Sequence, residues 1–263
     1  MTTRDDDFLK GSIAGPQSDL DWEEAPWDRP HFGAPVLQIT RVRVDGPDCA
    51  DDLGALLARF RASGVALVSC RIPASQLAES MWLERHGFRF IEVVYHPSRS
   101  LDLDDALLSE PVCDVRSAVS ADLDVLHEIA GTAFGHERLH ADPRIDNAVA
   151  NRRYQHWMRS ALAHPTQRLE VVAEEGQTIG FFVIELRTDG TCYWHMNAIG
   201  REHQGRGLGR RAWLAMMRRA REAGARRVET CVAARNFRVL NLYSRLGFGL
   251  SEPEMTLHWL PTS

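Results

Sequence analysis

Hydrophobic positions along the chain follow two different periods, and together they predict a protein built from both strands and helices. Short runs rich in β-branched and aromatic residues are typical of strands. Longer segments with apolar residues three and four positions apart are typical of helices that bury one face. Strands are expected at residues 36–44, 65–71, 88–96, 112–118, 169–173, 178–186, 191–199, 227–233 and 255–260. Helices are expected at residues 51–62, 74–86, 121–134, 145–163, 208–223 and 237–246. This mixture predicts an α/β (α+β) chain with a central mixed sheet.

Polar stretches divide the chain into three expected parts. Residues 1–30 are rich in Asp, Glu, Pro and Gly, and we expect the acidic N-terminus at residues 1–21 to be disordered. Residues 22–110 and 111–263 are expected to form two domains, with the polar segment 97–110 as the linker between them.

A pattern around Gly64 recurs around Gly224. In both places a helix, the glycine, a strand and a second helix follow one another, and the pattern ends at Phe88 and Phe248. The separation is constant, because 224 − 64 = 160 and 248 − 88 = 160. One interpretation is chance recurrence of a common pattern. The other is a truncated second copy of the same half-domain, in the front part of the chain.

Composition excludes several classes of protein. The net charge of −5 argues against a nucleic-acid binder, which usually carries a basic face. The five cysteines are far apart and form no C-x-x-C pair, so we expect neither disulfides nor a metal site. No signal peptide and no run long enough to span a membrane is present, and a cytoplasmic location is expected.

The most informative stretch is the glycine-rich turn at residues 204–209, which lies between a predicted strand and a predicted helix. Glycines let the backbone turn tightly and approach a ligand, and the free amides of the following helix favour an anion. A P-loop would end in Lys-Ser/Thr, but Arg210 follows here. A dinucleotide-binding turn would lie early in a parallel unit, whereas this turn is late in the chain.

Gln204, Gly207 and Gly209 instead follow the Q/R-x-x-G-x-G/A signature, and this region resembles the GNAT family of acetyltransferases. A second signature of that family follows at the usual distance, with Asn236 seven residues before Tyr243 (243 − 236 = 7). The resemblance covers residues 112–260. It implies a GNAT fold with a mostly antiparallel sheet, preceded by a degenerate GNAT-like half that is non-catalytic.

The resemblance also implies direct transfer of an acetyl group from acetyl-CoA to an amine, without a metal. Residues that would bind acetyl-CoA are Ile199, Gly200, Arg201, Gln204, Gly205, Arg206, Gly207, Leu208, Gly209, Arg210, Asn236 and Tyr243. The amide of Ile199 would polarise the thioester carbonyl. Tyr243 would protonate the leaving thiolate. His195, at the same strand parity as Asn197 and Ile199, is the first candidate base, and Glu185 is the second. Leu83 stands in the front copy where Tyr243 stands in the rear one.

The acceptor is indicated less directly. The stretches 27–33 and 133–144, followed by Tyr154 and Trp157, resemble the dTDP-fucosamine acetyltransferase group. That likeness implies a nucleotide-linked amino sugar as substrate, and Arg138, His140 and Arg144 would bind it. Alternatives are an antibiotic amine, an amino-sugar thiol conjugate, a protein N-terminal amine, or a non-catalytic sensor of coenzyme A. A homodimer is left open.

Overall fold

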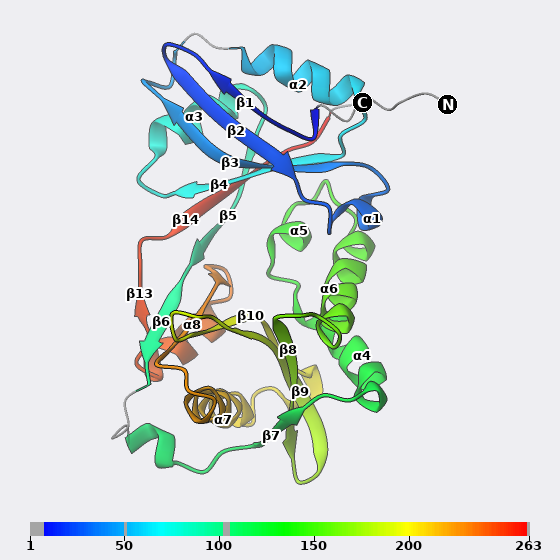
Figure 1. Ribbon diagram of the computed structural model, residues 1–263, viewed down its shortest axis with the longest axis vertical. Helices are drawn as coiled ribbons and strands as arrows, with labels where there is room; N and C mark the ends of the chain where they lie inside the picture. The colour runs from blue at the N-terminus through cyan, green and yellow to red at the C-terminus, as the bar shows by residue number, and fades with distance from the viewer. Residues whose placement is uncertain (1–7, 50–51, 102–105, 262–263) are drawn as a thin grey trace. The chain divides into compact units, whose positions relative to one another are not determined.

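The computed structural model describes residues 8–49, 52–101 and 106–261, and the chain forms two compact units (Figure 1). The first unit comprises Met1–Val94 and Glu252–Ser263, and the second comprises Tyr95–Ser251. Each unit contains a mixed sheet with helices packed on it, as the α/β prediction requires.

The strands of the first unit are neighbours in the order β1-β2-β3-β4-β14-β5. Only β3 and β4 are parallel, and the other neighbours are antiparallel. The elements are β1 (Lys10–Ala14), β2 (Ser18–Glu24), α1 (Arg29–Phe32), β3 (Val36–Val44), α2 (Leu53–Ala62), β4 (Leu67–Pro73), α3 (Leu77–Arg85), β5 (Arg89–Tyr95) and β14 (Glu254–Trp259). Large apolar side chains from the helices and strands, including Phe60, Trp82 and Phe88, form its core.

The acidic N-terminal segment is ordered from residue 8 onward, contrary to the disorder expected for residues 1–21. β1 and β2 form a hairpin whose second strand pairs with β3. The acidic residues of β2 face arginines of β3, with Asp21 and Arg41 2.7 Å apart and Asp19 and Arg43 3.0 Å apart. Trp22 is buried beneath this hairpin. Cross-strand charge pairs and one buried indole therefore order a segment whose composition favours disorder. Residues 1–7 lie outside the described part of the chain.

The second unit has a sheet in the order β13-β6-β11-β10-β9-β8-β7, in which only β10 and β11 are parallel. The strands within the residues of the second unit are β6 (Pro97–Ser100), β7 (Asp114–Ser117), β8 (Gln167–Glu174), β9 (Gln177–Leu186), β10 (Thr191–Ile199), β11 (Arg227–Thr230), β12 (Val232–Ala233) and β13 (Gly249–Leu250), and β12 is not part of this sheet. Its helices are η2 (Ala106–Ser109), η3 (Ser120–Asp122), α4 (Leu123–Ala133), α5 (Arg138–Ala141), α6 (Asn147–Ala161), η4 (Arg201–His203), α7 (Leu208–Glu222) and α8 (Phe237–Arg245). The mostly antiparallel mixed sheet predicted from the sequence is confirmed.

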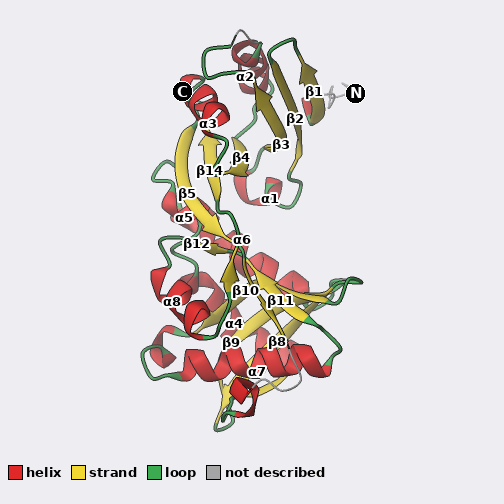
Figure 2. Cartoon of the chain, turned by 90° about the vertical axis from the view of Figure 1, so that its left-hand side faces the viewer, coloured by secondary structure: helices red, strands yellow, loops and turns green. Residues whose placement is uncertain are grey.

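Helices cover this second sheet on both faces. Figure 2 shows α7 running across the strands on one face, and residues of α7 and α8 share one hydrophobic core with that face. α4 and α6 lie side by side (Figure 1) and bury the opposite face of β8, β9 and β10 in a separate core. Each core joins the apolar stripes of its helices to apolar side chains of the strands.

Two strands, β6 and β14, each belong to a different sheet from the strand that precedes them in the chain. β6 follows β5 along the chain but pairs with β11 and β13 of the second unit. β14 follows β13 but pairs with β4 and β5 of the first unit, as the red strand in Figure 1 shows. The segment 97–110 is therefore not a simple linker, because it contains β6 and η2. The unit boundaries accordingly differ from the expected break after residue 110.

The repeat seen in the sequence corresponds to a repeated structure. α3 and α8 are related by the same offset, since 237 − 77 = 160. The residues that precede them, Gln76 and Asn236, have nearly the same backbone angles, φ −81° and ψ 60° against φ −84° and ψ 56°. Each unit also has one parallel strand pair, β3–β4 and β10–β11. The front half is a truncated copy of the same fold.

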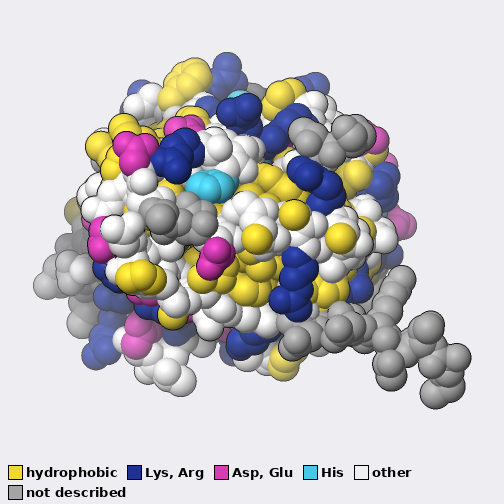
Figure 3. All heavy atoms as spheres, turned by 90° about the horizontal axis from the view of Figure 1, so that it is seen from above, with side chains coloured by type: hydrophobic (Ala, Val, Ile, Leu, Met, Phe, Trp, Pro, Cys, Tyr) yellow, Lys and Arg dark blue, Asp and Glu magenta, His cyan; other side chains and the backbone are white. Residues whose placement is uncertain are grey.

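The surface of the described residues carries charges of both signs. On the face drawn in Figure 3, basic, acidic and hydrophobic side chains are interspersed. Among the described residues, no helix is both long and apolar enough to cross a membrane.

Candidate active site

The parallel pair of the second unit opens into a fork. β10 and β11 are paired from Thr191 to Trp194 and from Arg227 to Thr230. The Thr230 hydroxyl donates to the Trp194 carbonyl at 2.9 Å, and β11 ends there. β10 continues to Ile199, so the edge of its last residues that faces away from β9 is no longer paired with β11. This free edge can accept an extended ligand as an added strand.

The amide of Ile199 points toward this free edge. The amide of Gly200 donates to the Ile179 carbonyl of β9 at 2.8 Å. Hydrogen-bonding directions alternate along an antiparallel strand, so the amide and carbonyl of Ile199 face away from β9. The Ile199 carbonyl accepts a hydrogen bond from Gln204 Nε2 at 2.9 Å. Gln204 therefore fixes the start of the turn rather than extending its side chain toward an anion.

The glycine-rich turn has the backbone that the sequence predicted. Gly205 and Gly207 have φ of +77° and +78°, a region that residues with a Cβ rarely adopt. Gly207 is the N-cap of α7, which has no acidic residue in its first turn. Gly205, Arg206 and Gly207 are exposed, so the first amides of a fifteen-residue helix open toward solvent.

The side chain of Arg210, which was predicted to bind acetyl-CoA, is paired with a carboxylate of the same unit. Its guanidinium forms two hydrogen bonds with Glu110, at 2.7 and 3.2 Å. Arg211 pairs with Glu174, and Arg218 donates to the carbonyls of Leu108 and Glu110. These three arginines of α7 thus hold the segment around η2 and the strand β8 in place, and the charges of Arg210 and Arg211 are matched by carboxylates within the unit. Arg201 and Arg206 remain exposed beside the turn.

Tyr243 lies buried near the fork. It projects from α8 and is 1% exposed. Burial raises the pKa of Tyr243 to about 12, and hydrogen-bonding groups of Trp213, Thr230 and Asn197 offset part of that rise. Thr230 ends the paired part of β11, and Asn197 lies on the unpaired part of β10. The phenol is therefore protonated at neutral pH and is held by the residues that form the fork.

A β-bulge changes the predicted direction of His195. The register between β10 and β9 shifts between Trp194 and Met196. Trp194 belongs to the core beneath α7 and α8, whereas Met196 belongs to the core beneath α4 and α6. The His195 ring lies 6.0 Å from Trp157 of α6, on that second face. The prediction that His195 shares its parity with Asn197 is wrong, because a bulge adds one residue to the strand.

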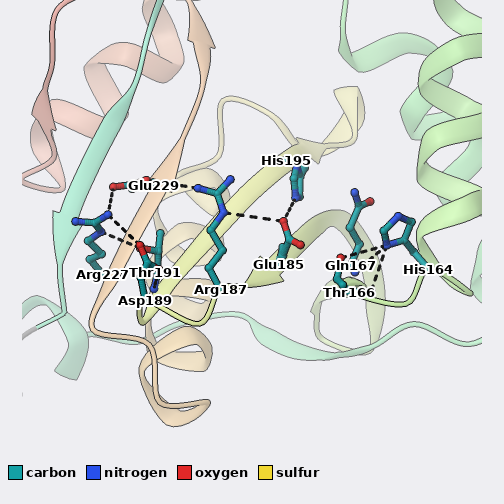
Figure 4. Close-up of polar contacts among 10 residues, drawn as sticks. All are labelled: His164, Thr166, Gln167, Glu185, Arg187, Asp189, Thr191, His195, Arg227 and Glu229. Atoms are coloured by element: carbon teal, nitrogen blue, oxygen red, sulfur yellow. Dashed lines mark hydrogen bonds and ion pairs between the residues drawn. The ribbon is translucent and has the colours of Figure 1, made fainter. Parts of the chain in front are cut away.

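His195 is hydrogen-bonded to a carboxylate. Its Nε2 lies 3.0 Å from Glu185 Oε2 on the neighbouring strand β9 (Figure 4). Desolvation lowers the pKa of His195, and Glu185 offsets part of that effect. The pKa of Glu185 is itself lowered, first by a hydrogen bond with Thr166 and then by His195 and Arg187. At neutral pH the pair is a carboxylate and a neutral imidazole.

The three residues predicted to meet the acceptor are mostly held inside the unit. Arg144 forms two hydrogen bonds with the buried carboxylate of Asp142, at 2.8 and 2.9 Å. His140 Nε2 contacts Asn151 Oδ1 at 2.7 Å. Arg138 begins the short helix α5 and is half-buried.

Asn236, predicted to contact the pantetheine arm, is the N-cap of α8. Its side chain accepts a hydrogen bond from the Val239 amide at 3.4 Å. That role orders the helix which carries Tyr243, and it follows from the preference of Asn for N-cap positions.

Sequence reasoning missed two residues of this region. Thr230 was predicted only as part of a strand, and nothing in its neighbours showed that pairing ends there. Glu110 was assigned to a linker, yet it neutralises Arg210, which is far from it in the sequence. Among the described residues, no group of three or more His, Cys, Asp or Glu side chains could hold a metal ion.

Comparison with known proteins agrees with this geometry. The model of the "Acetyltransferase (GNAT) family" matches residues 123–248. No curated protein matches the chain. A GCN5-related N-acetyltransferase from Sphaerobacter thermophilus is similar in structure, with a TM-score of 0.60, 18% identity, and coverage of 96% of this chain and 84% of that one.

Two further solved structures have the same fold across nearly the whole chain. A conserved protein of unknown function from Staphylococcus epidermidis has a TM-score of 0.65 and 14% identity, covering 96% of this chain and 95% of that one. A tandem GNAT protein from the clavulanic acid biosynthesis pathway has a TM-score of 0.57 and 14% identity, covering 97% and 85%. The last likeness fits a chain made of two related units.

Residues 123–248 are a GNAT acetyltransferase domain, and the protein is an N-acetyltransferase enzyme of that type. GNAT enzymes use acetyl-CoA as their acetyl donor, and the fork and the glycine-rich turn lie within the matched residues.

Proposed function

We propose that the fork and the turn of the second unit bind acetyl-CoA in one extended path. The amides of residues 205–209 hold the diphosphate, where the positive end of α7 favours an anion. The free edge of β10 pairs with the amide groups of the pantetheine arm. The Ile199 amide donates to the thioester carbonyl and stabilises the negative charge that develops on it. The free edge next to positive-φ Gly205 and Gly207 is the observation that carries this proposal.

Tyr243 serves as the proton donor in this proposal. Its phenol stays protonated at neutral pH because burial raises its pKa to about 12. Thr230 and Asn197, which act on its pKa, lie where the strands part. A donor at that place can protonate the thiolate as the carbon–sulfur bond breaks.

We propose a small-molecule primary amine as the acceptor, with a nucleotide-linked amino sugar as the first candidate. Its support is the likeness of residues 133–144 and of Tyr154 and Trp157 to the dTDP-fucosamine acetyltransferase group. Arg138, His140 and Arg144 are the predicted contacts for an anionic group of this substrate. The first unit takes no part in the chemistry: α3 carries the buried Leu83 where α8 carries Tyr243.

The proposal is tested by following thiol release from acetyl-CoA with a panel of amines. The panel holds dTDP-4-amino-4,6-dideoxygalactose, glucosamine, an aminoglycoside, a cysteinyl amino-sugar conjugate and a peptide with a free N-terminus. Thiol release that depends on the nucleotide sugar supports the first candidate, and release with another amine reassigns the acceptor. Calorimetric binding of acetyl-CoA without release on any amine would identify a sensor, and no binding at all would overturn the proposal.

A further inference from the structure

The bulge in β10 places a second chemical group at the fork, on the face of the sheet opposite Tyr243. Trp194 is the last residue of β10 paired with β11, so His195 is the first residue beyond the fork. Its ring lies on the α6 face, close to Trp157 and 4.9 Å from Tyr193. Tyr243 belongs to the core on the α7 and α8 face. The two groups therefore approach the end of the paired strands from opposite sides.

The hydrogen bond to Glu185 determines which nitrogen of His195 is basic. A carboxylate only accepts hydrogen bonds, so Nε2, 3.0 Å from Glu185 Oε2, carries the proton. Nδ1 then carries the lone pair. The His195 side chain is 17% exposed, which leaves it within reach of a ligand or one water molecule.

Charged neighbours of His195 come from each element around it. Glu185 and Arg187 lie at the end of β9, and Arg187 stacks on the Tyr193 ring at 4.2 Å. His164 lies in the segment before β8 and lowers the pKa of His195, as Arg187 does. On the α6 side, Arg153 stacks on Trp157 at 5.2 Å. Glu185 is the group that favours the protonated imidazole, opposing desolvation and the effects of Arg187 and His164 on the pKa of His195.

We infer that His195 is the general base of acetyl transfer and that Glu185 is its positioning residue. The inference rests on the proposed function. The acceptor enters from the α6 face as an ammonium and gives one proton to His195 Nδ1, directly or through water. Its nitrogen then forms a bond with the thioester carbon. As the carbon–sulfur bond breaks, Tyr243 protonates sulfur, and the second proton lost by the nitrogen restores the phenol. His195 releases the first proton to solvent, so charge and atoms balance.

The orientation of Glu185 is itself fixed. Its pKa is lowered chiefly by a hydrogen bond with Thr166, and Arg187 approaches it at 4.0 Å. Thr166 is held in turn, because its amide and that of Gln167 donate to His164 Nδ1 at 3.3 and 3.1 Å (Figure 4). This arrangement keeps the carboxylate ionised and directed at His195 when the imidazole becomes charged.

The test compares the pH dependence of kcat/KM in wild type, His195→Gln, Glu185→Gln and Glu229→Gln. Glu229 is the matched control, since it pairs with Arg187 and Arg227 on the same sheet but does not contact His195. Rates are measured with the fastest amine of the panel. In wild type, kcat/KM should fall as the pH is lowered, and this fall is the acid limb of the profile. In His195→Gln, kcat/KM should drop by about a hundredfold or more and the acid limb should disappear. In Glu229→Gln, the acid limb should stay at the same pH as in wild type.

Glu185→Gln carries the discriminating result. Removing the carboxylate removes the group that raises the pKa of His195, so the acid limb must move to lower pH and kcat must fall. Histidine NMR titration of the same variants, with acetyl-CoA bound, must show the same direction for His195. An active wild type whose acid limb is unchanged in both His195→Gln and Glu185→Gln overturns this inference alone. A wild type that neither binds acetyl-CoA nor releases thiol overturns the proposed function instead.

Discussion

The Thr230 hydroxyl donates to the Trp194 carbonyl at 2.9 Å, at the last paired residues of the only parallel strand pair among the described strands of the second unit. This bond closes the fork just before the two strands part. Thr230 also acts on Tyr243, whose pKa it lowers against the rise that burial causes. One buried hydroxyl therefore links the shape of the coenzyme site to the proton donor.

Replacement Thr230→Val keeps the volume of this side chain but removes the bond to Trp194 and the polar group that acts on Tyr243. We expect a stability loss of about 1 kcal/mol and a fall in kcat of about tenfold, measured by denaturant unfolding and steady-state kinetics. An unchanged kcat would show that Thr230 does not organise the site.

Tyr243→Phe separates proton donation from binding. If the phenol protonates the leaving thiolate, kcat should fall at least a hundredfold, while calorimetry should give a nearly unchanged Kd for acetyl-CoA. Leu242→Ala is the neighbouring control, because Leu242 lies on the same helix and is half-buried. A chemical step of unchanged rate in Tyr243→Phe would remove the phenol from the mechanism.

The buried phenol also predicts a dependence of stability on pH. Its folded pKa of about 12 is above the ordinary value of 10, so the folded protein holds this proton more tightly than the unfolded chain does. The stability of wild type relative to Tyr243→Phe should therefore be constant below pH 10 and fall as the pH rises from about 10 to 12. This difference in pKa corresponds to about 3 kcal/mol. Equal slopes for the two proteins between pH 10 and 12 would mean that the phenol titrates normally.

Gly207→Ala tests the turn against a control at the other end of the same helix. Gly207 and Gly224 have φ of +78° and +88°, and a Cβ at either would meet no atom within 4 Å. The backbone strain should therefore be similar, about 1–2 kcal/mol at each position. Only Gly207 lies in the proposed diphosphate site. We expect Gly207→Ala to weaken acetyl-CoA binding by about tenfold and Gly224→Ala to leave Kd unchanged, by calorimetry. Equal Kd values in the two variants would argue against the diphosphate site.

Strand exchange makes the C-terminus essential to the first unit. Leu257 of β14 is fully buried in that sheet, whereas Leu250 of β13 is 53% exposed. Leu257→Ala should cost about 2–5 kcal/mol, and Leu250→Ala less than about 0.5 kcal/mol. Denaturant unfolding followed by tryptophan fluorescence measures both. A loss of similar size in the two variants would contradict the central position of β14.

Local patterns predicted most of the helices and strands because each buries one regular face. The glycines at 205 and 207 directly precede the apolar stripe of α7 in the sequence, and each determines only its own local backbone. The turn could therefore be predicted. The repeat that relates Gly64 to Gly224 predicted the first unit for the same reason.

What the sequence could not predict depends on pairing between distant residues. The bulge at His195 leaves no mark on the alternation of β10, yet it turns the imidazole to the other face. Arg210 resembles a phosphate contact in the sequence, but Glu110 lies beside it in the fold. The pairing partners of β6 and β14 cannot be read from their own residues, because each strand could equally have paired with the strand next to it in the chain.

The central claim is that the thioester lies in the fork between β10 and β11, beside Tyr243. A crystal structure of the full chain with coenzyme A tests it most directly. The account predicts the diphosphate on the amides of residues 205–209 and the sulfur within hydrogen-bonding reach of the Tyr243 phenol. A diphosphate bound elsewhere, or a sulfur separated from that phenol by packed side chains, would contradict it.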